Sequence, residues 1–101
     1  MNPANMMAQV KRMQAEMRKA QEELAQTVVS GTAAGGSVEV EMTCDSRVKS
    51  VTIAPDAVDA ADVETLEDLV VVAVNDALQR VAEESARRMG AITGGLHVPG
   101  L

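Results

Sequence analysis

The chain has 101 residues, no aromatic side chain, a single cysteine and a formal net charge of −6 at neutral pH. This length fits one domain with a modest core. One cysteine excludes an internal disulfide and a zinc site built from several cysteines, and the missing aromatic rings exclude recognition of single-stranded nucleic acid by base stacking.

No apolar run is long enough to span a membrane, and the N-terminus lacks the apolar core of a signal peptide. We therefore expect a soluble cytoplasmic protein. Its charge is unevenly distributed: residues 1–20 hold four basic and one acidic side chain, whereas residues 21–80 hold three basic and twelve acidic ones. An acidic chain that concentrates positive charge on one segment presents that segment to a polyanion.

Residues 1–26 are predicted to form a helix. Asn2 suits the N-cap, and Pro3 suits the first helical position. Apolar residues then recur at alternating spacings of four and three, the 3.5-residue period of a coiled-coil seam. The seam residues are Met6, Val10, Met13, Met17, Ala20 and Leu24.

The basic residues of this helix form two pairs with a spacing of seven, Lys11 with Arg18 and Arg12 with Lys19. In the heptad frame they occupy positions b and c, which point away from the seam. Two interpretations remain open: an ordinary solvated face, or a surface that contacts phosphates. Glu16 can pair with a neighbouring cation and favours the first.

Residues 27–54 are predicted to form a three-stranded antiparallel meander, with strands near residues 28–32, 37–44 and 47–53. Gly31, Gly35 and Gly36 punctuate the first connection. The second strand alternates between apolar and polar residues, so it has one apolar face. In the third strand, Val48 falls out of phase with the apolar residues after it, which indicates a β-bulge or local burial on both faces. The helices must cover the apolar face of this sheet.

Residues 56–89 contain neither Gly nor Pro and predict a second long helix. Asp59 or Asp62 suits its N-cap, and Gly90 suits the C′ position that ends it. Residues 69–74 are apolar on every face, so a buried strand is the alternative, but the helix-forming flanks favour a helix. Residues 90–101 have no periodicity and predict a flexible tail.

A helix that is apolar all round is buried all round, which in so small a protomer predicts a homodimer. Its interface is expected on the sheet and the second helix. The predicted interface residues are Val38, Val40, Met42, Leu69, Val70, Ala73, Val74 and Ala77.

Four features follow one another along the chain. A first helix rich in Met and Gln ends in Gln21-Glu22-Glu23-Leu24, and a glycine turn precedes Val38-Glu39-Val40. The segments 66–69 and 73–77 come next, and residues 93–101 close the chain with Gly-Gly-Leu and Pro-Gly-Leu. No single motif is specific, but the ordered set resembles the YbaB/EbfC family of bacterial nucleoid-associated proteins over essentially the whole length.

This resemblance implies an α+β protomer of order αβββα, with a small antiparallel sheet flanked by two long helices. It further implies an intertwined homodimer of tweezer-like shape that binds duplex DNA in the nucleoid. Both long helices contribute to DNA binding in the family. The DNA contacts implied in this chain are Lys11, Arg12, Arg18, Lys19, Arg80, Arg87 and Arg88. By themselves, the arginines of the second helix equally suit the negative C-terminal end of a helix dipole.

No catalytic, metal-binding or nucleotide-binding motif is evident in the sequence. His97 has no companion ligand or nucleophile, and the acidic residues between positions 56 and 68 lack the spacing of a calcium loop. Gly35-Gly36 is not followed by the Lys of a phosphate-binding loop. We expect no enzyme activity, metal, cofactor or small-molecule substrate. The alternative function is an adaptor that binds proteins of the replication or recombination machinery without contacting DNA.

Overall fold

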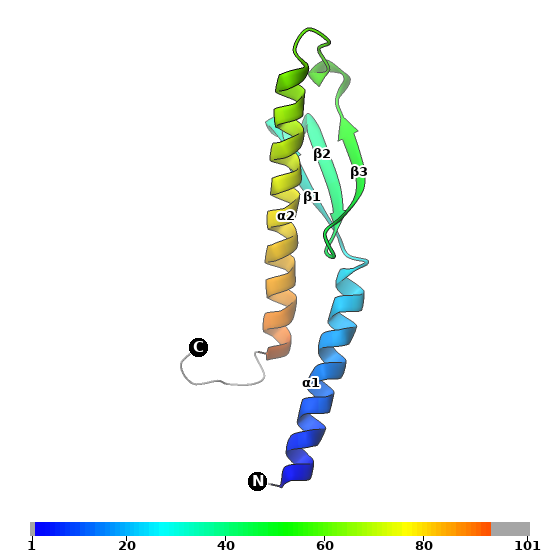
Figure 1. Ribbon diagram of the computed structural model, residues 1–101, viewed down its shortest axis with the longest axis vertical. Helices are drawn as coiled ribbons and strands as arrows, with labels where there is room; N and C mark the ends of the chain where they lie inside the picture. The colour runs from blue at the N-terminus through cyan, green and yellow to red at the C-terminus, as the bar shows by residue number, and fades with distance from the viewer. Residues whose placement is uncertain (1, 94–101) are drawn as a thin grey trace, which may run out of the picture.

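A computed structural model, which describes residues 2–93, has the predicted α+β architecture (Figure 1). The fold is elongated, with principal extents of 70 × 27 × 16 Å. The predicted tail residues 94–101, with His97, lie outside the described residues. The elements are α1 (Pro3–Leu24), β1 (Val28–Ala33), the 3₁₀ turn η1 (Ala34–Gly36), β2 (Val38–Thr43), β3 (Arg47–Ile53), the 3₁₀ turn η2 (Pro55–Ala57) and α2 (Val63–Thr93).

Helix α1 begins as the sequence predicts. The Asn2 side chain accepts a hydrogen bond of 3.0 Å from the amide of Ala4, and proline follows at the first helical position. At the other end of the helix, Ala20 and Leu24 are buried. The seam becomes uncovered towards the N-terminus, where Met6 and Val10 are 51% and 50% exposed. The N-terminal part of α1 therefore projects from the body of the protein (Figure 1).

The three strands form an antiparallel meander in the order β1-β2-β3. The predicted alternation of β2 is confirmed, because Val38, Val40 and Met42 are buried while the residues between them are only half-buried. Helix α2 covers this face over β1 and β2 and encloses most of the core, to which α1 contributes Leu24 (Figure 1). Helix α1 instead continues away from the end of the sheet (Figure 1).

Strand β3 contains the predicted β-bulge. Its register with β2 shifts so that Ser50 lies opposite Glu41 and Val48 lies opposite Met42, which leaves Lys49 without a direct partner. The bulge returns Val48 to the face that α2 packs on. Val48 is nevertheless 53% exposed, because α2 does not extend over β3.

The β2–β3 turn holds Ser46 at a φ of 66°, in the left-handed region that glycine or asparagine usually occupies. The amide of Ser46 donates to the carbonyl of Thr43 at 2.9 Å. At the start of the turn, the amide of Cys44 donates to the carbonyls of Leu24 and Thr27, at 3.1 and 2.9 Å. This hairpin therefore docks onto the junction between α1 and β1.

Helix α2 begins after Asp62, whose carboxylate accepts from the amide and the hydroxyl of Thr65, at 3.3 and 2.6 Å. Residues 69–74 are helical, so the strand alternative is wrong. The predicted end at Gly90 is also wrong, since the helix continues to Thr93. One glycine costs a helix only about 1 kcal/mol, and the next proline in the sequence, Pro99, is nine residues further on. Arg87 and Arg88 consequently lie before the last turn.

Candidate nucleic-acid interface

The four basic residues of α1 share one side of the helix. Successive residues are rotated by about 100°, which directs these side chains roughly opposite the apolar seam. All four are exposed, and the ion pairs found within residues 2–93 involve other side chains. The pairing that Glu16 was expected to offer is absent from them. The four residues are Lys11, Arg12, Arg18 and Lys19.

Arg80 lies on the exposed surface of α2. Its Nε is 3.9 Å from Oδ1 of Asp76, one helical turn earlier. The other oxygen of Asp76 accepts a hydrogen bond of 2.9 Å from the amide of Thr32 on β1, a strand that pairs on one side only. Asp76 thus ties the helix to the sheet edge and partly neutralises Arg80.

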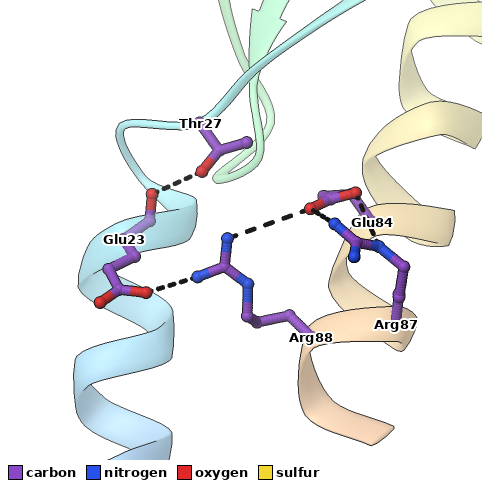
Figure 2. Close-up of polar contacts among 5 residues, drawn as sticks. All are labelled: Glu23, Thr27, Glu84, Arg87 and Arg88. Carbon is purple, nitrogen blue, oxygen red and sulfur yellow. Dashed lines mark hydrogen bonds and ion pairs between the residues drawn. The ribbon is translucent and has the colours of Figure 1, made fainter. Parts of the chain in front are cut away.

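Arg87 and Arg88 belong to a charged cluster shown in Figure 2. Arg87 binds both carboxylate oxygens of Glu84, through Nη2 at 2.5 Å and Nε at 3.3 Å. Arg88 reaches across to α1, where its Nη1 lies 2.5 Å from Oε2 of Glu23. Its Nη2 is 4.0 Å from Oε1 of Glu84. All three predicted DNA contacts on α2 are therefore paired with carboxylates of the protein itself, Arg80 at the longest distance, apart from the second contact of Arg88.

The pKa of Glu84 lies below its ordinary value, chiefly because Arg87 hydrogen-bonds to the ionised carboxylate. Desolvation opposes this effect, and the charges of Arg87 and Arg88 lower the pKa further by smaller amounts. The pKa of Arg87 is raised in return. The spacings of three and four from Glu84 are visible in the sequence. Glu23 is separated from Arg88 by 65 residues, so only the tertiary fold identifies this partner.

The predicted dimer-interface residues lie in two environments. Val38, Val40, Met42, Ala73 and Ala77 are buried within the single chain, so their burial requires no partner. Leu69, Val70 and Val74 are half-buried.

Apolar surface stays exposed on α2 and β3. Val71 and Leu78 are 57% and 40% exposed and fall at helical spacing with Val74. The carboxylate of Asp76 binds the outer edge of β1, so the flank of α2 that carries Asp76 faces β1. Val71, Val74 and Leu78 lie on the opposite flank and therefore face β3. There Val48 and Val51 are exposed on the same face of the sheet. Together they form an exposed apolar surface beside α2.

Residues 2–93 contain neither a candidate metal site nor a helix suited to crossing a membrane. They contain no group of three or more candidate metal ligands, and none of their helices has the length and apolarity needed to cross a membrane. Cys44 is buried, and desolvation raises the pKa of its thiol above the ordinary value. A buried thiol of raised pKa suits a core position rather than a reactive one.

Comparison with known proteins gives a consistent result. Residues 1–96 match the YbaB/EbfC DNA-binding family. A nucleoid-associated protein of Thermoanaerobacter pseudethanolicus is 50% identical over 100 residues, which cover 99% of this chain and 90% of the relative. A nucleoid-associated protein of Dictyoglomus turgidum is 47% identical over 98 residues, covering 97% and 94% of the two chains. The crystal structure of the uncharacterized protein HP0035 from Helicobacter pylori shares the fold, with a TM-score of 0.73 at 20% identity and coverage of 96% and 99%.

Proposed function

Since this chain belongs to the YbaB/EbfC DNA-binding family, we propose that it binds duplex DNA in the nucleoid with little sequence preference. The observation that carries this proposal is the exposed basic side of α1. It holds four cations on a helix that projects from an otherwise acidic chain. We call this side of α1 the basic arm; its residues are Lys11, Arg12, Arg18 and Lys19.

Binding by the basic arm is electrostatic. Lysine and arginine side chains contact phosphate oxygens and release the counterions condensed on the duplex, which favours binding without reading the sequence. The acidic remainder of the chain repels DNA and thus confines it to the basic arm. Arg80 and Arg87, seven residues apart on α2, add weaker contacts, because each shares its charge with a carboxylate.

The protein acts as a homodimer in this proposal. The exposed apolar surface beside α2, formed by Val71, Leu78, Val48 and Val51, is the surface that a second copy covers. A chain without aromatic side chains gains little buried area from its own core, so covering this surface contributes to the stability of the fold. Two copies then carry two basic arms, which together hold one duplex.

The test compares two pairs of charge removals. Lys11→Gln with Lys19→Gln removes two charges from the basic arm, and Arg47→Gln with Lys49→Gln removes two from β3 as a matched control. The slope of log affinity against log salt is about −0.9 for each phosphate neutralised. Each dimer has two arms, so the two substitutions remove four phosphate contacts. We therefore expect the arm variant to lose affinity and to flatten this slope by about 3.6, with little change in the control. Equal losses in both variants, or an affinity of the wild type that salt does not alter, would refute binding by the basic arm.

A protein-binding adaptor is the second candidate, because Met6, Met7 and Val10 expose an apolar surface near the tip of α1. The two functions separate in the same assay. A folded dimer that does not bind duplex DNA at low salt supports the adaptor, whereas salt-sensitive binding supports the basic arm.

A further inference from the structure

Arg88 lies on the inner side of α2. Ala77, Val81, Glu84 and Arg88 follow one another at spacings of four, three and four residues. They therefore lie on one side of α2, the side that packs on the sheet. Beyond the end of the sheet this side faces α1, and the guanidinium of Arg88 turns towards Glu23 (Figure 2). Its side chain is only 29% exposed, against 73% for Arg87.

Glu23 sits at the base of the basic arm. Its carbonyl accepts a hydrogen bond of 2.8 Å from the hydroxyl of Thr27, and its carboxylate accepts from Arg88 at 2.5 Å. Within residues 2–93, the Glu23–Arg88 pair is the ion pair that joins α1 to α2. The last turn of α1 is therefore attached to the body through both its backbone and a charged side chain, while the N-terminal part of the helix projects from the body (Figure 1).

The attachment point matters because α1 acts as a lever. Lys11 is twelve residues from Glu23, which at 1.5 Å per residue is about 18 Å along the helix. A tilt of about 10° at the base therefore moves Lys11 by about 3 Å, a large displacement compared with the ~4 Å reach of an ion pair. A small change in the position of Glu23 therefore produces a larger displacement at the N-terminal end of α1.

We propose that Arg88 is a positioning residue, which directs the basic arm by binding Glu23 and does not itself contact phosphate. Glu84 holds the second amino group of Arg88 and thereby orients the guanidinium towards α1. This role rests on the proposed binding of DNA by the basic arm. It assigns to the cluster of Glu23, Glu84 and Arg88 the function of setting the separation and angle of the arms in the dimer.

The effect of Glu23→Gln on DNA affinity has opposite signs for a positioning role of Arg88 and for direct phosphate contact by Arg88. The substitution keeps every basic residue and removes one negative charge, so a phosphate-binding Arg88 predicts equal or tighter DNA binding. Positioning predicts binding about three- to fivefold weaker, because only a fraction of the arms is correctly directed. Glu22→Gln removes the same charge from the neighbouring residue and serves as the matched control, with unchanged or tighter binding.

A charge exchange provides the second comparison. Arg88→Glu alone weakens binding under either mechanism. Combined with Glu23→Arg, and with Glu84→Gln to remove the carboxylate that would repel the one introduced, it restores the ion pair in reverse, and positioning predicts an affinity within about twofold of the wild type. If this triple variant binds as weakly as Arg88→Glu alone, Arg88 contacts phosphate and the positioning role is wrong. Circular dichroism and sedimentation confirm that each variant is folded and of unchanged oligomeric state.

The direction of the arm can also be measured without DNA. Spin labels on cysteines at Gln14 of α1 and Ser30 of β1, in a Cys44→Ala chain diluted with unlabelled protein, report their distance distribution by pulsed electron resonance. Glu23→Gln should broaden or shift this distribution, and Glu22→Gln should not. An unchanged distribution overturns the role of Arg88. Because this measurement needs no DNA, it tests the positioning role even if the proposed DNA binding fails.

Discussion

Gly31 is the position at which α2 comes closest to the sheet. A Cβ atom added there would lie 2.6 Å from Cα of Ala77, and closer still to the amide nitrogen of Ala77 and the carbonyl oxygen of Ala73. These are backbone atoms, so no side-chain rotation relieves the overlap. Gly31→Ala therefore requires the whole of α2 to withdraw from β1.

The size of the effect depends on this displacement. Ordinary contact to a Cβ begins at about 3.4 Å, so the helix must withdraw by about 1 Å, and a gap of that size forfeits roughly a quarter to a half of each dispersion contact it opens. The contacts concerned include those of Val38 and Val40, the fully buried valines of the core. Overpacking of a core ordinarily costs about 1–3 kcal/mol, and we expect the upper end. For a domain of this size, that lowers Tm by roughly 12–24 °C.

The assay is thermal and urea unfolding, followed by circular dichroism at one fixed protein concentration, because the proposed dimerisation would make Tm concentration-dependent. Gly90→Ala is the matched control. It lies within α2 with open space around its Cα, so alanine should stabilise the helix by about 0.5–1 kcal/mol. Adding Ala77→Gly to Gly31→Ala should not restore stability, since the overlapping atoms belong to the backbone. A loss below about 0.5 kcal/mol in Gly31→Ala, or rescue by Ala77→Gly, would refute this account.

Four further expectations concern other parts of the fold. Ser46→Gly should raise Tm, because glycine adopts the positive φ of this turn without the roughly 1 kcal/mol that other residues incur. Asp76→Ala should cost about 1 kcal/mol and speed hydrogen exchange of the Thr32 amide, which loses its acceptor. The pKa of Glu84 is lower in the folded than in the unfolded protein. The stabilising effect of Glu84 is therefore complete above the ordinary pKa of 4.5 and disappears as the pH falls through the lower folded pKa. The difference in Tm between wild type and Glu84→Gln should shrink over the same fall in pH. Val71→Asp should convert the proposed dimer to monomers in sedimentation, since it places a charge on the exposed apolar surface beside α2.

Each expectation has an opposing outcome. An unchanged Tm in Ser46→Gly would mean that the turn relaxes out of the left-handed conformation. Unaltered exchange of the Thr32 amide would show that another group replaces the carboxylate. A Tm difference that stays constant through acid pH would remove Glu84 from the ionic cluster. Val58→Asp, which changes a similarly exposed valine in the loop before α2, should leave the oligomeric state intact; if both aspartates disrupt it, the effect is not specific to the apolar surface beside α2.

Local patterns determined the elements of this protein. Asn2-Pro3 begins α1, the alternation of Val38, Val40 and Met42 defines the buried face of β2, and the phase shift at Val48 marks the bulge. Each of these rests on interactions between neighbours in the chain or on the period of a helix or strand. The same reasoning failed at Gly90, where the propensity of one residue was too weak to end a long helix.

The tertiary structure decided which of these surfaces remain available. Val38 and Val40 are covered by α2 of the same chain, whereas Val71 and Val51 stay uncovered. Arg88 looked like one more cation at a helix end, but the fold brings Glu23 to it from 65 residues away. Periodicity assigns a residue to a side of its own helix or strand, but only the packing of the elements determines what that side meets. The basic arm is therefore evident in the sequence, and the contact that directs it is not.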